Sequence, residues 1–560
     1  MEKTTAVKSE ILSDTKKYFF QIRWAIVLIA AAVFAAHGSV LFSQRFGIDT
    51  DAVMLGMHSF LDNGRQGLYW LAELIGLDLS WFNLYYAQIL TLLFLILSPV
   101  AFGWLYHLAQ GRGEKRGGEL LALLALGVSF AVSPFWTAQI YFLNQSAQVL
   151  LAFALTPVAI ALAEEARRDL RRKWYLLPGA FLLMQITFSS YQVLVVAYVV
   201  GTAVYFLLFS LRERQTLRQS LSWILFHGVV FALNLMLYLG ISKLFFMGEE
   251  SYLKDQILWT QLGFADGLKN CISAVWHTLL AQPPYYTGCY GIFVLFFLAL
   301  LIRRIWKEPE RTRGSRVLML LSALFVAGSP YLFMILFGGF LVDRMQLIQP
   351  FSQGSMLYLT ILLLCEEKPD RRAVRTGVRL VEAVLVIALC RDGLTNLNYC
   401  SRLYYTDEFV FQYSVRVAAD VYRDVKAMQQ SEEIAEKFRY EARDNIVILG
   451  YPEIPYNTTC VQGSTIGQSI FEFEAIVGNS LDRYRSRYFM QNLGYPLSLD
   501  FTEGEALAFR YYFDEYFGAE VDAMPSYPVP GYVKCVLDEE TGMQYLVVKL
   551  GEDWRTYYWE

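Results

Sequence analysis

Long apolar runs without Asp, Glu, Lys or Arg recur along the first 390 residues of the chain. About 20 apolar residues in a helix cross the hydrocarbon core of a bilayer, so such runs predict membrane-spanning helices. The runs are Trp24–Phe42, Phe82–His107, Leu120–Phe135, Leu143–Ala163, Trp174–Ser189, Tyr191–Leu211, Leu221–Ile241, Tyr290–Ile302, Val317–Phe340, Phe351–Cys365 and Val381–Leu389, the last beginning near Thr376. The pattern predicts an α-helical polytopic membrane protein with about eleven spans.

The pattern changes after residue 390. Three segments have helical apolar spacing, and they are Phe409–Gln430, Ile470–Met490 and Glu503–Phe517. Asn445–Leu449 is a β-branched run that predicts a strand, and Val533–Leu537 with Tyr545–Leu550 predict a hairpin. We therefore expect an N-terminal tail over residues 1–23, a transmembrane domain over 24–390 and a small α/β domain over 391–560.

The distribution of positive charge predicts which side each end of the chain faces. With a cytoplasmic N-terminus, the tail and the even-numbered connections hold 27 Lys and Arg, and the opposite connections hold 6. Positive charge concentrates on the cytoplasmic side of membrane proteins. We therefore expect a cytoplasmic N-terminus, with Trp24–Phe42 acting as a signal anchor, and an extracytoplasmic C-terminal domain.

The composition excludes several classes of protein. Of all residues 55% are hydrophobic and 18% are charged, against about 25% charged in soluble domains. Such a chain is too apolar to be disordered, and nucleic acid is not an expected partner. The middles of the predicted spans lack charged residues, which disfavours an ion-coupled carrier. We therefore expect any chemistry to lie at a membrane face.

The first predicted outer loop, Leu41–Trp81, contains two carboxylates close to the end of the first span, Asp49 and Asp51. The low dielectric at the membrane interface raises the pKa of a carboxylate, which suits general-base work on a hydroxyl. The alternative is that both residues cap a helix that begins near Ala52. An Asp-x-Asp triplet with His58 nearby is also a weak candidate for a divalent metal, but we expect no cofactor.

Positive charge is scarce in the predicted outer segments, which makes each outer arginine informative. Arg65 in the first loop and Arg344 after the ninth span are the best-placed groups to neutralise a lipid-linked phosphate. A structural pair with Asp343 is the alternative for Arg344. The same loop predicts helices over Ala52–Phe60 and Leu68–Leu77, the second lying in the interface plane.

The acidic pair followed by Asn63-Gly64-Arg65-Gln66-Gly67 resembles the first outer loop of the GtrII-like glucosyl transferases. These are bacterial polytopic enzymes with a GT-C-type architecture. Further matching fragments are Asn144-Gln-Ser146, Ser190-Tyr191-Gln192, and Asp343-Arg344 with Pro350. The likeness extends over most of residues 19–390 and adds little about the C-terminal domain.

The resemblance implies transfer of a hexose, usually glucose, from a polyprenyl-phosphate sugar to a cell-envelope glycan. The acceptor would be a polysaccharide or a teichoic-acid-like polymer at the outer face of the bacterial cell membrane. By position, Asp49 and Asp51 match the acidic motif, and which of them is the base stays open. Arg65 and Arg344 would face the phosphate. The sugar-binding candidates are Tyr191, Gln192 and Asn144, with Trp70, Tyr69 or Trp136 stacking on the sugar.

Two other functions are compatible with this sequence. A lipid or glycan exporter would require a continuous polar or charged path through the bundle. A non-catalytic subunit of envelope assembly would not depend on the two carboxylates. Substitution of Asp49 and Asp51 therefore separates the enzyme from both alternatives.

Overall fold

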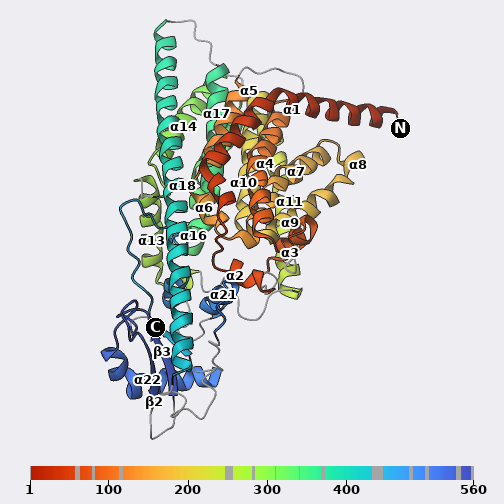
Figure 1. The fold of residues 1–560 in the computed structure, drawn as a ribbon. Helices are drawn as coiled ribbons and strands as arrows, with labels where there is room; N and C mark the ends of the chain where they lie inside the picture. The colour runs from red at the N-terminus through yellow and green to blue at the C-terminus, as the bar shows by residue number, and fades with distance from the viewer. Residues whose placement is uncertain are drawn as a thin grey trace. The chain divides into compact units, whose positions relative to one another are not determined.

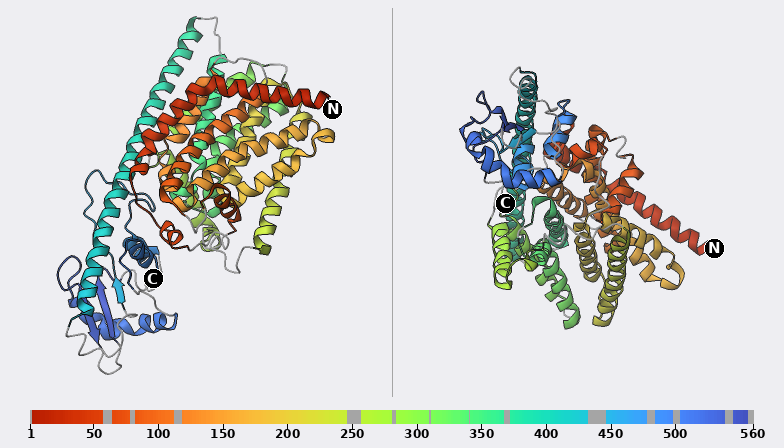
Figure 2. Two further views of the ribbon diagram at one scale, coloured as in Figure 1. Left: turned by 45° about the vertical axis from the view of Figure 1, so that its right-hand side comes forward. Right: turned by 90° about the horizontal axis from the view of Figure 1, so that it is seen from below.

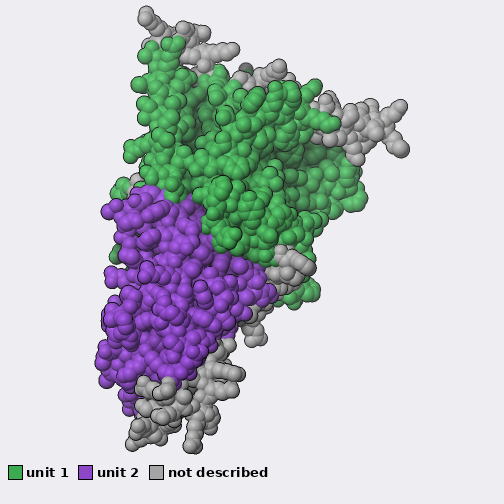
Figure 3. Space-filling model, in the orientation of Figure 1, with its two compact units in different colours: residues 1–44, 59–401 green, residues 45–58, 402–560 purple. Residues whose placement is uncertain are grey.

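A computed structural model describes residues 2–56, 64–77, 82–111, 118–245, 257–280, 284–308, 311–339, 341–366, 372–431, 446–477, 484–497, 503–537 and 544–555. The chain divides into two compact units, coloured separately in Figure 3. Unit 1 comprises residues 1–44 and 59–401, and unit 2 comprises residues 45–58 and 402–560. A short piece of the first predicted outer loop therefore belongs to the same unit as the C-terminal part of the chain.

Unit 1 is built from helices, which Figure 1 labels along the chain. Its longer helices are α1 (Glu2–His37), α4 (Leu84–Gln110), α5 (Glu119–Ala131), α7 (Leu143–Arg168), α9 (Leu176–Ser190), α10 (Val193–Arg212), α11 (Leu217–Phe245), α13 (Phe264–Leu279), α14 (Tyr290–Trp306), α15 (Arg313–Gly328) and α17 (Ile348–Glu366). Shorter elements lie between them: η1 (Gly38–Phe42), α3 (Gln66–Ile75), α6 (Phe135–Ile140), α8 (Leu170–Lys173), η3 (Leu258–Thr260), η4 (Ser329–Tyr331), α16 (Leu332–Phe337) and η5 (Asp343–Met345).

Seven of these helical segments are long and apolar enough to cross a membrane. They are Thr15–Phe42, Leu84–Gln110, Leu143–Arg168, Val193–Arg212, Leu217–Phe245, Arg313–Phe337 and Ile348–Glu366. Two shorter apolar helices, Glu119–Ala131 and Leu176–Ser190, coincide with further predicted spans. The prediction of a polytopic helical membrane protein is confirmed, whereas eleven crossings and their orientation remain predictions.

Aromatic side chains fill the centre of unit 1 where α4, α7 and α17 meet. The ring of Phe102 lies 5.5 Å from that of Phe153 and 4.3 Å from that of Phe351. All three side chains are almost fully buried. Such rings bury large apolar areas and favour tilted contacts, so they fix how the three helices pack.

Helix α18 (Arg372–Gln429) is longer than the sequence pattern predicts. The last apolar run and the segment Phe409–Gln430 were expected to be separate elements, but one continuous helix contains both. No Pro interrupts residues 372–429, and most residue types tolerate a helix when packing supports it. Its first part belongs to unit 1 and its last part to unit 2.

Unit 2 contains a small three-stranded sheet with the order β1-β3-β2. β1 (Ile446–Leu449) pairs in parallel with β3 (Gln544–Lys549), which pairs in antiparallel fashion with β2 (Val533–Leu537). Helix α22 (Glu503–Ala523) lies beside the sheet (Figure 2) and packs Phe513 and Phe517 against it. The predicted strand, hairpin and α/β character of this region are all present.

Two predicted helices differ from the observed ones. Within Ile470–Met490, which was expected to be a single helix, the structure describes α20 (Ile470–Val477) and α21 (Tyr484–Asn492), while residues 478–483 lie outside the described part. The hydrogen bond from the Arg485 N–H to Glu474 excludes one continuous helix. The helix predicted over Ala52–Phe60 is wrong in its extent, because α2 runs over Thr50–Met54 and a turn follows at Gly56 with φ of 78°. A glycine with positive φ ends a helix without steric cost. Residues 57–60 lie outside the described part of the chain.

Candidate functional site

The acidic loop, residues 45–56, belongs to unit 2 and presents its two carboxylates in different environments. Asp49 has a left-handed backbone with φ of 69°, and its carboxylate accepts a hydrogen bond from Arg485 Nη1 at 2.8 Å. Asp51 is buried with 1% of its surface exposed. Its Oδ1 accepts the backbone N–H of Ala52 at 2.9 Å, while Oδ2 has no hydrogen-bond partner in the described part of the chain.

Burial raises the pKa of Asp51 to about 7. The Ala52 N–H and the positive charge of Arg485 oppose the shift, whereas the negative charges of Asp49 and Glu474 add to it. A carboxylate with a pKa near neutrality and a free oxygen can take a proton at physiological pH. Asp51 therefore has the properties of a general base, and Asp49 has those of a half-exposed ion-pair partner.

The capping alternative is not what the structure shows. Asp49 occupies the N-cap position of α2, but its side chain makes no capping hydrogen bond. Asp51 lies in the first helical turn and accepts only from the adjacent residue among the described contacts of its side chain. A stabilising N-cap side chain instead accepts from a backbone N–H two or three residues later.

Within unit 1 the structure brings Arg65, Tyr191 and Arg344 together, although they are far apart in the sequence. The Arg65 guanidinium carbon lies 5.2 Å from the Tyr191 ring centroid, and the Tyr191 hydroxyl donates to the backbone oxygen of Arg344 at 3.3 Å. The Arg344 guanidinium in turn lies 4.5 Å from the ring of Phe142. We call these four residues the cation–aromatic cluster. Two guanidinium groups held beside aromatic rings form a suitable environment for a phosphate.

Helix α11 holds the segment that carries Arg65. The Tyr238 hydroxyl donates to the Gly64 carbonyl at 3.4 Å, and Gln192 Nε2 donates to the same hydroxyl at 3.4 Å. Gln66 Nε2 donates to Ser242 Oγ at 3.2 Å. Gly67 lets α3 approach α9 closely, because a Cβ there would lie 2.4 Å from the Ile186 carbonyl oxygen. These contacts explain why amide, aromatic and glycine residues surround Arg65.

Several buried amide side chains near the cluster have an oxygen without a hydrogen-bond partner among the described residues. They lie on α6, on the first two turns of α7 and at the start of α17, and they are Gln139, Asn144, Gln145, Gln148 and Gln349. Helix α6 packs against η5, which contains Arg344. Buried polar groups are nearly always hydrogen-bonded, so such a set indicates a place for water or a hydroxyl-rich ligand.

The aromatic candidates lie in contrasting positions. Trp70 on α3 is 42% exposed, whereas Trp136 is fully buried and its indole N–H donates to the Phe130 carbonyl at 2.6 Å. Trp136 therefore cannot stack on a sugar without unpacking the core, and this expectation is corrected. Trp70 is exposed enough to contact a ligand, so it remains a candidate for stacking on the sugar.

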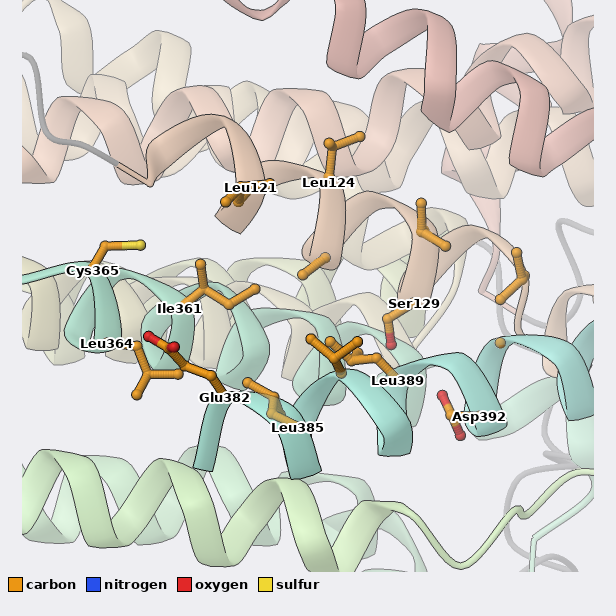
Figure 4. A pocket seen from close by; sticks show the side chains of 15 residues that line it. Leu121, Leu124, Ser129, Ile361, Leu364, Cys365, Glu382, Leu385, Leu389 and Asp392 are labelled. Carbon is orange, nitrogen blue, oxygen red and sulfur yellow. The ribbon is translucent and has the colours of Figure 1, made fainter. Parts of the chain in front are cut away.

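A largely apolar groove of about 540 Å³ lies between α5, α17 and α18 within unit 1 (Figure 4). Its wall is formed mainly by leucine, valine and isoleucine side chains such as Leu124, Ile361 and Leu389. Glu382 lies toward one end, and Ser129 and Asp392 lie toward the other. The lining is suited to a hydrocarbon chain.

The polar side chains at one end of the groove form hydrogen bonds with one another. Asp392 Oδ2 accepts from Gln353 Nε2 at 2.8 Å and from Asn396 Nδ2 at 3.4 Å, and Asp392 also accepts from the Thr287 hydroxyl. Gln353 Nε2 donates to Ser129 Oγ at 2.9 Å as well. A carboxylate with three donors has little capacity left for substrate, so this network has a structural role.

Among the described residues, no group of three or more His, Cys, Asp or Glu side chains is arranged to hold a metal ion. His58, which the sequence suggested as a metal ligand beside Asp51, lies outside the described residues. The acidic loop pairs its carboxylates with an arginine and backbone groups instead.

Sequence reasoning missed the partners of the acidic loop in unit 2 and most of the buried amides. Arg485 and Glu474 are more than 400 residues from Asp49 in sequence, and no local pattern links them. The sequence did contain a signal for the buried amides. Gln139, Gln145 and Gln148 are polar residues within or beside otherwise apolar helices, where a polar group needs a partner.

The chain matches the model of a known protein family. The model of the family described as glucosyl transferase GtrII matches residues 38–363, which is more than half of the chain. No curated protein shows significant similarity to the chain. The matched segment includes the acidic loop and the cation–aromatic cluster, and it ends before α18.

Proposed function

Because the chain belongs to the glucosyl transferase GtrII family, we propose that it transfers a hexose, namely glucose, from a polyprenyl-phosphate carrier to a cell-envelope glycan. The reaction takes place at the outer face of the bacterial cell membrane. The N-terminus is cytoplasmic and the C-terminal domain is extracytoplasmic. The acceptor is a polysaccharide or a teichoic-acid-like polymer. Family membership and the long apolar helices support a membrane glycosyltransferase, and the donor, acceptor and sidedness are the proposal.

Two features of unit 1 support a lipid-linked donor. The α5–α17–α18 groove offers an apolar surface for the prenyl chain, and the cation–aromatic cluster offers two guanidinium groups for the phosphate. Burying a long hydrocarbon chain contributes about 0.8 kcal/mol per methylene. A soluble nucleotide sugar would have no use for such a groove.

In the proposed reaction Asp51 takes the proton of an acceptor hydroxyl. The hydroxyl oxygen bonds to the anomeric carbon of glucose at the same time. The bond between that carbon and the phosphate oxygen breaks, and its electron pair leaves with the polyprenyl phosphate. Arg65 and Arg344 neutralise the negative charge that develops on this leaving group. The pKa of Asp51 near 7 is matched to a general base that works at physiological pH.

The unpartnered buried amides carry the sugar-binding part of the proposal. Asn144 and its neighbours on α6, α7 and α17 keep acceptor oxygens inside a protein interior at a cost that hydroxyl groups of a bound sugar would remove. Tyr191 and Gln192 add a phenol and an amide at the α9–α10 junction. Carboxamides and phenols of this kind recognise the donor and acceptor pattern of a hexose.

The proposal is tested with membranes that contain the full-length protein. Radiolabelled polyprenyl-phosphate glucose is supplied in one arm and UDP-glucose in the other, in membranes that lack the enzyme for making the lipid donor. We expect label to enter the envelope glycan only from the lipid donor, and we expect a deletion strain to lack one hexose per repeating unit by mass spectrometry. Transfer from the nucleotide sugar alone, or an unchanged glycan in the deletion strain, would reject the proposal.

The groove gives a second prediction. Val386 lines the groove and is 56% exposed, so Val386→Phe should narrow it without disturbing the core. Losing one or two methylenes of buried prenyl chain costs about 0.8 kcal/mol each, so KM for the lipid donor should rise about 4- to 15-fold with kcat little changed. Val317→Phe is the matched control, because Val317 is 53% exposed on α15 and lies outside the groove. Equal kinetics for both variants would place the prenyl chain elsewhere.

A further inference from the structure

The acidic loop is embedded in unit 2 by contacts from residues that the family model does not cover. The ring of Phe46 lies 5.4 Å from that of Phe411 on α18 and 5.5 Å from that of Phe489 on α21. Arg45 Nε lies 3.0 Å from Asp407 Oδ2, and both side chains are nearly buried. The family match ends at residue 363, so the C-terminal part of the chain supplies the surroundings of the motif.

Helix α21 contacts the two acidic residues directly. Arg485, in its first turn, donates to the Asp49 carboxylate at 2.8 Å and also lies 5.3 Å from the ring of Phe473. Asn492, in its last turn, donates from Nδ2 to the backbone oxygen of Asp51 at 2.8 Å. The two ends of one short helix therefore hold the two ends of the Asp49–Asp51 triplet.

The N-terminus of α21 is itself fixed by a buried carboxylate. Glu474 on α20 is 1% exposed and accepts the backbone N–H groups of Arg485 at 2.9 Å and of Ser486 at 3.2 Å. It also accepts the Ser486 hydroxyl. Satisfying the free N–H groups of the first turn in this way sets where the helix begins and where the Arg485 side chain points.

We propose that Arg485 and Asn492 are positioning residues for the glucosyl transfer, holding the acidic loop so that Asp51 stays buried with one carboxylate oxygen free. This inference rests on the proposed function and assigns a catalytic support role to the C-terminal domain. Arg485 holds the Asp49 carboxylate through the ion pair, and Asn492 fixes the backbone at Asp51. Neither residue touches substrate in this role.

The charges around Asp51 predict how the variants behave with pH. The charged groups that act on it are Asp49 on its own loop, Arg485 on α21 and Glu474 on α20. Arg485 lowers the pKa of Asp51 and Asp49 raises it. Arg485→Gln should therefore move the acid limb of the pH–rate profile to higher pH, by up to about one unit, and the additional change Asp49→Asn should move it back.

The experiment measures kcat against pH for the full-length protein in lipid vesicles with polyprenyl-phosphate glucose. Besides the shift for Arg485→Gln, we expect Arg485→Lys to restore the acid limb, since it keeps the charge. Asn492→Ala should lower kcat about 3- to 10-fold through loss of one hydrogen bond, with the acid limb unmoved because the lost group is neutral. Arg487→Gln on the same helix is the control, as Arg487 contacts Tyr488 and is not among the charges acting on Asp51.

For Arg485, a merely structural role would lower the rate equally at every pH and leave the acid limb in place, so an unmoved limb in Arg485→Gln overturns the inference. For Asn492, whose loss moves no limb, a kcat of Asn492→Ala equal to that of the wild type at a temperature where both are folded overturns it. If Arg485→Gln does not fold, as judged by thermal unfolding, the shift expected for Asp49→Asn alone, to lower pH, decides the same question. The failure of the proposed function looks different. The wild-type protein would then transfer no glucose from the lipid donor, whereas failure of this inference alone leaves wild-type transfer and the loss in Asp51→Asn intact and leaves the acid limb of Arg485→Gln unmoved.

Discussion

Replacing Asp51 by asparagine should lower the rate of glucosyl transfer about 10²- to 10⁴-fold, which is the usual contribution of a general base. Asparagine has nearly the same shape and keeps an oxygen to accept the Ala52 N–H, so the loop should keep its conformation. The variant loses only the ability to take a proton. Initial rates with saturating polyprenyl-phosphate glucose measure the effect, and KM for the donor should change little.

The control for Asp51 is Glu73→Gln, which removes an exposed carboxylate from helix α3 and should leave the rate unchanged. The wild-type enzyme should lose activity as the pH falls through about 7, the pKa to which burial raises Asp51. The sign follows from the base being active when deprotonated. Full activity of Asp51→Asn, combined with inactivity of Asp49→Asn, would transfer the role of base to Asp49.

Removing the positive charge of Arg344 should reduce kcat/KM for the lipid donor about 10²- to 10³-fold, as loss of one preorganised group that stabilises developing charge does elsewhere. Arg344→Gln keeps a planar polar end group but removes both the charge and the guanidinium that lies over the Phe142 ring. Arg344→Lys should recover part of the loss, because it retains the charge without the planar fork that binds two phosphate oxygens. Steady-state kinetics with the polyprenyl-phosphate donor measure both variants.

Lys269→Gln is the control for Arg344, since Lys269 is an exposed cation on α13 and should have no effect on transfer. A double variant of Arg65→Gln and Arg344→Gln should lose less than the product of the two single losses, because both guanidinium groups act on one phosphate. Independent, fully multiplicative effects would mean that the two arginines serve different groups. Normal kinetics for Arg344→Gln would leave Arg344 with the structural role that its neighbour Asp343 suggested.

Much of the fold could be predicted from local sequence. Apolar runs such as Leu143–Ala163 became α7, and the run Asn445–Leu449 became β1 (Ile446–Leu449), because burial of apolar side chains and local backbone preference act over a few residues. The failures are at element ends and continuations. Helix α18 runs through residues that looked like a boundary, since side chains buried at intervals along it, such as Leu385, Cys400 and Val421, outweigh weak local preferences.

The candidate site was predictable only in part. The scarcity of outer positive charge selected Arg65 and Arg344, the family resemblance added Tyr191, and the structure places the three in one cluster. The same resemblance could not distinguish Asp49 from Asp51, because the two differ in burial and partners rather than in sequence context. Arg485 decides that difference by pairing with Asp49, and it lies outside the segment that the family shares.

The sequence by itself determined that this chain is a helical membrane protein with a small α/β region, since the length and apolarity of each run are local properties. The tertiary structure alone decided which distant side chains meet. It buried Asp51 beside contacts from α21, and it brought Arg65 and Arg344 to Tyr191. It also left amide oxygens in the interior that have no hydrogen-bond partner among the described residues. Burial and charge proximity set the pKa and reactivity of a group, and both depend on chain segments hundreds of residues apart.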